Sequence, residues 1–235
     1  MGCALRFDLG RLYRVGVMPS PSANERLKAI LKAGHLFENK YRIVRPLGAG
    51  SFAVVVQARH EVMKRDVALK FLKPKVVAAN PEVSERFVKE VQIAAKLRHP
   101  NVVTIFDFGK TQDGIYYMVQ EFIDGATLDE RVPPGTPLSM ERSLDIVQQV
   151  LACLSEAHAN NIVHRDLKPS NLMSMRHRDT GQEVIKVLDF GVAKLLEDPG
   201  RDAGPVRKST KFIGTPIYMS PEQIQGHKVS AASDL

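Results

Sequence analysis

Residues 164–171 (HRDLKPSN) place a carboxylate, an amine and an amide within a few positions of one another, just after an apolar turn. Asp166 can accept a proton from an attacking hydroxyl, and Lys168 can neutralise charge on a group in transfer. Asn171 can bind a metal ion through its amide oxygen. These residue types at this spacing predict metal-assisted transfer of a charged group to a hydroxyl.

A second metal ligand is expected at Asp189. This aspartate follows Val187 and Leu188 at the end of an apolar strand, and Phe190 and Gly191 come directly after it. A carboxylate in that position is a suitable ligand for a hard cation.

A glycine-containing segment, residues 48–55 (GAGSFAVV), lies between two expected strands. Glycine lets backbone N–H groups approach a polyphosphate without interference from a Cβ atom. A strand rather than a helix follows, which excludes a dinucleotide-binding fingerprint, and no Gly-Lys-Ser/Thr is present for a Walker loop. Ala53 stands where a third glycine would be, so the segment alone is equally compatible with a simple glycine hairpin.

Lys70 closes the apolar run that begins at Val67, and its ammonium should therefore point into a cleft. Glu90 lies between Phe87 and Ala94 on an expected helix, where it could pair with Lys70 and direct it toward a phosphate. Each of the two residues, taken alone, is also compatible with an ordinary surface charge.

The elements that must position these residues follow from hydrophobic periodicity. Period-two runs rich in β-branched and aromatic residues predict strands, and apolar residues at helical spacing predict helices. The expected strands are 41–47, 53–59, 66–71, 102–108 and 115–122, and the expected main helices are 81–97 and 139–160. A capping box formed by Ser22 and Glu25 predicts a further amphipathic helix at 22–33, ended by Gly34. Residues 175–183 are expected to form a polar hairpin without catalytic residues.

Composition narrows the class of protein. The 235 residues are 44% hydrophobic and 25% charged, with a formal net charge of +7, which is typical of a soluble globular chain. The basic residues are spread along the chain, which favours a solvated surface over a nucleic-acid site. No stretch is apolar enough to span a membrane. Cys3 and Cys153 are too few for a disulfide framework, and Cys153 is expected in the core, so a reducing cytoplasm is predicted.

These segments resemble, in their order and spacing, those of eukaryotic-type (Hanks-type) serine/threonine protein kinases. The resemblance covers residues 41 to 235 and includes the stretch 214–222 (GTPIYMSPE), whose style is similar to that of bacterial members. It implies an α+β, two-lobed protein kinase-like fold, with a small β-rich N-lobe containing one main helix and an incomplete helical C-lobe. It also implies three parts: an N-terminal extension with a short amphipathic helix (1–40), the N-lobe and hinge (41–123), and a partial C-lobe (124–235).

The resemblance assigns roles to individual residues. Asp166 would be the catalytic base, assisted by Lys168 and Lys70, while Asn171 and Asp189 would bind Mg²⁺. Gln120 would occupy the gatekeeper position, and Lys168 followed by Pro169 is typical of the Ser/Thr type. The residues expected to bind ATP are Leu47, Gly48, Ala49, Gly50, Ser51, Phe52, Ala53, Val54, Val55, Ala68, Lys70, Glu90, Glu121 and Ile123.

The function implied is ATP- and Mg²⁺-dependent transfer of the γ-phosphate to Ser or Thr hydroxyls of proteins, in signal transduction. Expected partners are ATP and protein substrates; autophosphorylation and a homodimer are both compatible with the resemblance, and neither nucleic acid nor a membrane segment in this piece is expected. The alternative is an inactive, truncated kinase or pseudokinase that serves as a nucleotide- or protein-binding module. Such a truncation is expected because Asp234 and Leu235 would begin the central C-lobe helix. The expected location is the cytoplasm, with a membrane anchor beyond Leu235 left open.

Regulatory and structural roles complete the expectations. Arg165 would contact a phosphorylated residue, with Ser209 and Thr210 as candidates; the less favoured alternative is that both are ordinary polar loop residues. His164 is expected to pack beside Phe190 rather than act as an acid–base group. His158 is also expected to have a structural rather than a catalytic role. Glu222 is expected to form an ion pair that holds the preceding activation segment in place. Asp234 is expected to steady residues 164–166.

Overall fold

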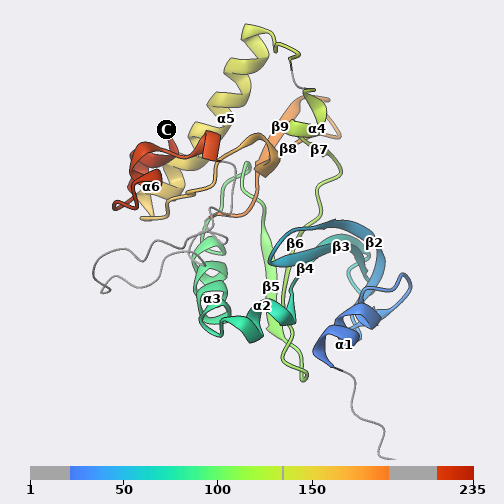
Figure 1. Ribbon diagram of the computed structural model, residues 1–235. Helices are drawn as coiled ribbons and strands as arrows, with labels where there is room; N and C mark the ends of the chain where they lie inside the picture. The colour runs from blue at the N-terminus through green and yellow to red at the C-terminus, as the bar shows by residue number, and fades with distance from the viewer. Residues whose placement is uncertain (1–21, 134, 191–215) are drawn as a thin grey trace, which may run out of the picture.

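The computed structural model describes residues 22–133, 135–190 and 216–235 and divides into two parts (Figure 1). One part is a six-stranded sheet accompanied by three helices, α1, α2 and α3. The other contains the long helix α5, a small three-stranded sheet and the C-terminal residues. The two parts meet where β6 leaves the large sheet and the chain enters β7.

The large sheet is antiparallel throughout, in the order β1-β2-β3-β4-β6-β5. Its strands are β1 (Leu36–Phe37), β2 (Tyr41–Ala49), β3 (Ala53–His60), β4 (Arg65–Leu72), β5 (Ile105–Lys110) and β6 (Tyr116–Glu121). Central β4 is the most buried, because Val67 to Leu72 have neighbours on both faces. Its sequence is accordingly a continuous apolar run interrupted only by Lys70, rather than an alternating one.

Three helices accompany this sheet: α1 (Ala23–Ile30), α2 (Pro74–Ala79) and α3 (Glu82–Ala94). The predicted capping box of α1 is confirmed, because Ser22 accepts a hydrogen bond from the Glu25 amide and the Glu25 carboxylate accepts one from the Ser22 amide. Leu27 is the buried residue of α1 and joins the core beneath the sheet. The helix ends at Ile30, before the predicted Gly34.

The second part is built around α5 (Met140–Ala159), which packs on β9. Ser139 caps its first turn and Asn160 ends it, so the predicted bounds of this helix are confirmed. The small sheet has the order β7-β8-β9, with β7 (Ala126–Thr127), β8 (Leu172–Arg176) and β9 (Glu183–Val187). The remaining helices are α4 (Leu128–Arg131), α6 (Pro221–Ile224) and the 3-10 turns η1 (Pro169–Asn171), η3 (Pro216–Tyr218) and η4 (Ala231–Asp234). The predicted hairpin at 175–183 is confirmed as the turn between β8 and β9.

Separate hydrophobic cores support the two parts. One core lies under the large sheet and includes Phe37, Phe71 and Tyr117, whose rings meet edge to face or tilted. The other lies between α5 and the small sheet and includes Leu154 and Ile185. Cys153 belongs to this second core, as predicted, and its burial raises the pKa of its thiol to about 12.

Several elements differ from the sequence-based expectation, among them β1, α2 and β5. The two-residue β1 and the six-residue α2 were not predicted, because segments this short show no hydrophobic period. The strand expected at 102–108 begins only at Ile105. Val102 instead forms an isolated parallel bridge with Val187 and so belongs to the second core rather than to the large sheet.

Candidate nucleotide-binding and catalytic site

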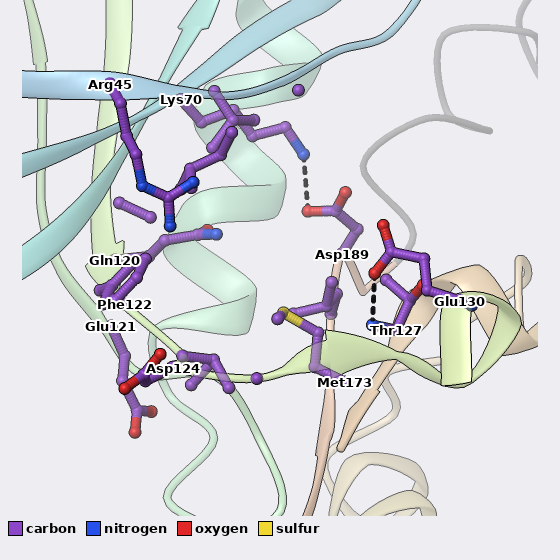
Figure 2. A pocket seen from close by; sticks show the side chains of 17 residues that line it. Arg45, Lys70, Gln120, Glu121, Phe122, Asp124, Thr127, Glu130, Met173 and Asp189 are labelled. Atoms are coloured by element: carbon purple, nitrogen blue, oxygen red, sulfur yellow. Dashed lines mark hydrogen bonds and ion pairs between the residues drawn. The ribbon is translucent and has the colours of Figure 1, made fainter. Parts of the chain in front are cut away.

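A cavity of about 340 Å³ lies at the junction of the two sheets. Figure 2 shows strands of the large sheet on one side and the small sheet, with α4, on the other. The residues that line the cavity are Arg45, Leu47, Gly48, Val55, Ala68, Lys70, Gln120, Glu121, Phe122, Ile123, Asp124, Gly125, Thr127, Glu130, Met173, Leu188 and Asp189. Its volume is in the range of pockets that hold small organic ligands.

Sheet register explains why distant residues share this cavity. Val55 pairs with Lys70 across β3 and β4, and Ala68 pairs with Gln120 across β4 and β6. Ala68 and Lys70 are two residues apart, so their side chains leave β4 on the same face. The antiparallel register therefore sets Val55, Ala68, Lys70 and Gln120 around one concave surface.

Lys70 is buried, and its charge is paired across the junction. The Nζ atom of Lys70 lies 2.6 Å from Oδ1 of Asp189, the contact drawn in Figure 2. Burial by itself would raise the pKa of Asp189, but the charge and hydrogen bond of Lys70 act together with the nearby charge of Lys168 to outweigh it, and the pKa of this carboxyl lies below its ordinary value. Asp189 is therefore ionised and available through its second oxygen to a cation.

Asp166, Lys168 and Asn171 form a compact hydrogen-bonded group. Lys168 Nζ lies 2.8 Å from Asp166 Oδ2, and Asn171 Nδ2 donates to the same oxygen at 3.0 Å and to the Asp166 carbonyl at 2.8 Å. The amide nitrogen of Asn171 is thus engaged, which orients its carbonyl oxygen away from Asp166. The backbone N–H of Leu188 also donates to the main-chain carbonyl of Asn171, which ties this group to the strand end that carries Asp189.

Asp234 holds the backbone that precedes Asp166. Its buried carboxylate accepts hydrogen bonds from the amides of His164 and Arg165, each at 2.7 Å, and lies 2.8 Å from His158 Nε2. Arg165 has a φ of +66°, a region that costs energy for a residue with a Cβ atom. The two amide bonds to Asp234 offset this cost, so the predicted steadying contact of Asp234 is present.

His164 is fully buried and packs against Phe190, with ring centroids 4.9 Å apart. Its Nε2 atom is 2.8 Å from the Leu188 carbonyl. Burial lowers the pKa of His164 below its ordinary value, so the imidazole is neutral and donates to that carbonyl. The predicted packing of His164 beside Phe190 is confirmed.

Contacts that the sequence did not predict hold the segment between the two sheets. Glu121 Oε2 lies 2.9 Å from Lys186 Nζ and accepts the Thr104 amide at 3.2 Å. Gly125 lies so close to the Ser174 carbonyl that a Cβ atom there would overlap it. Glycine at this position therefore lets the chain run directly beside β8.

Part of the predicted ATP-binding segment lies outside the cavity lining. Val54 packs against the core of the large sheet, and Ala53 is buried. Lys73 donates a hydrogen bond to the Gly50 carbonyl at 2.5 Å and its amide donates to the Phe52 carbonyl, so one residue fastens both sides of this turn. Among the predicted ATP-binding residues whose side chains are described, those that do not line the cavity are Ala49, Gly50, Ser51, Phe52, Ala53 and Val54.

Several expectations fall on residues that the structure does not describe. The side chain of Glu90, in α3, is outside the described part, as are Ser209, Thr210 and residues 214–215. Glu222 is described, and its carboxylate accepts a hydrogen bond from the Ser233 hydroxyl. Within the described residues the structure gives Glu222 this hydroxyl partner and no cationic one.

The sequence reasoning missed several lining residues. Thr127 and Glu130 form a capping box at the start of α4, with Glu130 Oε2 2.9 Å from the Thr127 amide, and this T-x-x-E pattern could have been read from the sequence. Arg45, Met173 and Leu188 carry no local signal, because only the fold brings them to the cavity.

A curled antiparallel sheet, a helical half and a lysine–aspartate ion pair between them define the two-lobed kinase fold. Residues 41–235 match the protein kinase domain family, and the chain belongs to that family.

Known proteins agree with this assignment. The chain is similar to serine/threonine-protein kinase pkn3 of Myxococcus xanthus, with 37% identity over 203 residues that cover 86% of this chain and 36% of that protein. It is also similar to serine/threonine-protein kinase PrkC of Bacillus subtilis, with 36% identity over 202 residues, covering 86% and 29% respectively.

Among solved structures, the kinase domain of Mycobacterium tuberculosis PknI superposes with a TM-score of 0.63 and 28% identity, covering 87% of this chain and 72% of that one. The predicted α+β kinase fold is therefore confirmed. The chain spans about a third of the length of the curated relatives it matches.

Proposed function

We propose that this protein is an ATP-dependent serine/threonine protein kinase that transfers the γ-phosphate of ATP to Ser or Thr hydroxyls of other proteins. The observation that carries the proposal is the Asp166–Lys168–Asn171 group, linked through Leu188 to the Lys70–Asp189 pair. Its relatives pkn3 and PrkC are named serine/threonine protein kinases.

In this proposal the cavity binds ATP. The backbone of Glu121 and Ile123 would contact the adenine, while Lys70 and the turn at 48–53 would hold the phosphates. Apolar side chains such as Leu47 and Val55 line the cavity and suit the flat faces of a purine. Residues 41–123 and 124–235 would then act as the two lobes on either side of the nucleotide, with 1–40 as an extension.

Mg²⁺ fits the donor set. Among the described residues, no three His, Cys, Asp or Glu side chains gather closely enough to hold a metal ion by themselves. Mg²⁺ is usually held by only one or two protein oxygens together with substrate phosphates. The carboxylate of Asp189 and the amide oxygen of Asn171 would supply those oxygens, and the bound ion would neutralise phosphate charge.

Asp166 would accept the proton of the substrate hydroxyl. Lys168, 2.8 Å from Asp166, would balance negative charge near the transferred group. The partners proposed are ATP and protein substrates, in a signalling role in the cytoplasm, and autophosphorylation is compatible with the same chemistry. No helix in the described ranges is both long and apolar enough to span a membrane.

The test compares the full chain with Asp166→Asn in an assay of phosphate transfer from labelled ATP to protein. We expect the substitution to lower the transfer rate by a factor of about 10² to 10⁴, because general-base assistance is lost. ATP affinity, measured separately, should change little, since Asp166 is not among the residues that line the cavity.

The matched control is Asp145→Asn, which makes the same change at an exposed position of α5. Its rate should equal that of the unmodified chain. Nucleotide binding without phosphate transfer in the unmodified chain would contradict the proposed activity and identify a binding module instead.

A further inference from the structure

A second cavity, of about 430 Å³, lies where α4, α5 and the β8–β9 hairpin meet. Its lining residues are Arg131, Arg142, Arg176 and Glu183. Arg131 ends α4, Arg142 lies in the first turn of α5, and Arg176 pairs with Glu183 across β8 and β9. Three separate elements thus bring three guanidinium groups to one cavity.

Glu183 is already satisfied by one of these arginines. Arg142 Nε and Nη2 donate to its two carboxylate oxygens, each at 2.9 Å, and the Ser174 hydroxyl donates to one of the same oxygens. The Arg142 hydrogen bonds hold the pKa of Glu183 below its ordinary value, so the carboxylate is ionised. The ion pair of Arg142 and Glu183 therefore lines the cavity in a fixed position, and the charge of Glu183 is already neutralised by Arg142.

The other two arginines leave a surplus of positive charge. Arg176 donates one hydrogen bond, from Nη1 to the Gly181 carbonyl at 3.2 Å. Within the described residues, neither Arg131 nor Arg176 forms an ion pair with a carboxylate. Both side chains are exposed, and three guanidinium groups with one carboxylate give the cavity a net charge of two positive.

We infer that this arginine pocket (Arg131, Arg142, Arg176 and Glu183) binds the phosphate of a phosphoserine or phosphothreonine in a partner protein. Such a phosphate carries a charge of about −1.5 to −2 at pH 7, which matches the surplus of the pocket. Guanidinium groups donate two parallel hydrogen bonds to phosphate oxygens, which an ammonium does not, and no lysine lines the pocket.

The shape and lining disfavour other anions. No aromatic side chain lines the pocket, so it lacks the stacking surface that single-stranded nucleic acids use. Its volume is that of a pocket for an organic group rather than for a single ion. The choice of a phosphorylated protein rests on the proposed function, because that activity produces phosphoserine and phosphothreonine.

The position of the pocket suits recognition of a substrate that is already phosphorylated. Helix α4 contributes Glu130 to the nucleotide cavity and Arg131 to the arginine pocket, so adjacent residues face the two sites. A protein held at the arginine pocket by one phosphorylated residue would be retained next to the proposed nucleotide cavity.

The test measures binding of a short fluorescent Gly/Ala peptide with a central phosphothreonine, by fluorescence anisotropy, to the full chain without ATP. We expect the chain to bind the phosphothreonine peptide at least about tenfold more tightly than the same peptide with threonine. The threonine peptide has no phosphate and so cannot form the charge-assisted hydrogen bonds. Arg131→Ala/Arg176→Ala should remove most of this difference. Arg131→Lys/Arg176→Lys should keep only part of it, since charge is retained without the guanidinium geometry.

The control Lys32→Ala/Lys40→Ala removes two exposed positive charges near α1 and β1 and should leave binding unchanged. Equal binding of the two peptides, an unchanged affinity of the double alanine variant, or equal binding of a glutamate peptide would overturn the inference. Because binding is measured without ATP, it is independent of catalysis. Phosphopeptide binding without phosphate transfer would contradict the proposed function only, and transfer without phosphopeptide binding would contradict the pocket only.

Discussion

At the residue scale, the proposed catalytic group depends on contacts made by residues that do no chemistry. Asp166 is approached by Lys168 and Asn171, and the backbone before it is held by Asp234 through two amide hydrogen bonds. Asp189 has a φ of +49°, and Arg165, directly before Asp166, has a φ of +66°. Left-handed backbone therefore occurs at or beside both aspartates of the proposed site. Non-glycine residues persist there only where surrounding contacts fix the backbone.

His164 gives a pH-dependent prediction at this scale. The folded protein resists protonation of this buried imidazole, whereas the unfolded chain takes up the proton near pH 6.5. Below that pH the unfolded state binds more protons. The free energy of unfolding should therefore fall as pH is lowered, by up to about 1.4 kcal/mol per pH unit from this group.

The measurement is urea denaturation at about pH 7.5 and pH 5.5 for the unmodified chain and for His164→Gln. Glutamine can still donate to the Leu188 carbonyl but does not titrate in this range. The loss of stability between the two pH values should be smaller in the variant. An identical loss in both proteins would show that His164 is not responsible.

At the element scale, a partly buried amide pair, Asn101 and Gln149, fastens α5 to β9 and so positions the strand that leads to Asp189. Gln149 Oε1 accepts hydrogen bonds from Asn101 Nδ2 and from the Ile185 amide, and its Nε2 donates to the Glu183 carbonyl. Asn101 also donates to the Ile185 carbonyl at 2.7 Å. These hydrogen bonds give partners to the backbone polar groups of Glu183 and Ile185 on the edge of β9 that faces α5.

Gln149→Leu should therefore destabilise the protein. The substitution removes three hydrogen bonds and leaves polar groups of Asn101 and β9 without partners in a partly buried region, which costs about 2–4 kcal/mol. The readout is the free energy of unfolding from urea denaturation.

Gln148→Leu is the matched control, because it makes the same change one residue earlier on an exposed part of α5. It should alter the free energy of unfolding by no more than about 0.5 kcal/mol. Equal effects of the two substitutions would show that the amide pair of Asn101 and Gln149 does not stabilise α5 on β9.

At the scale of the whole molecule, the nucleotide cavity is formed jointly by the two parts of the fold. Lys70 comes from the large sheet and Asp189 from the end of β9, and their ion pair crosses the junction. A ligand that occupies this cavity contacts both parts and should stabilise them together.

Mg²⁺-ATP should accordingly raise the unfolding midpoint. A ligand at a hundred times its Kd adds about 2.7 kcal/mol, which corresponds to roughly 5–10 °C for a chain of this size. Lys70→Ala should reduce the shift markedly, while Lys75→Ala, at an exposed position of α2, should preserve it. The measurement is thermal denaturation with and without Mg²⁺-ATP, and an equal shift in both variants would contradict a role for Lys70 in nucleotide binding.

The sequence by itself determined most of the secondary structure and the class of fold. Caps and periodicity are local, so the bounds of α5, the capping box of α1 and the strands at 41, 53 and 66 could be predicted closely. The spacing of residues 164–171 and the aspartate at 189 indicated the chemistry, because those residues are close along the chain or follow a strand.

Only the tertiary structure decided which distant residues meet. The partnership of Lys70 with Asp189 and the entry of Arg45 and Met173 into the cavity depend on sheet register and packing. The arginine pocket has the same origin, because its residues come from α4, α5 and the β8–β9 hairpin. Exposed arginines spread through a sequence carry no signal of their proximity, since that proximity arises only when separate elements pack around a common core.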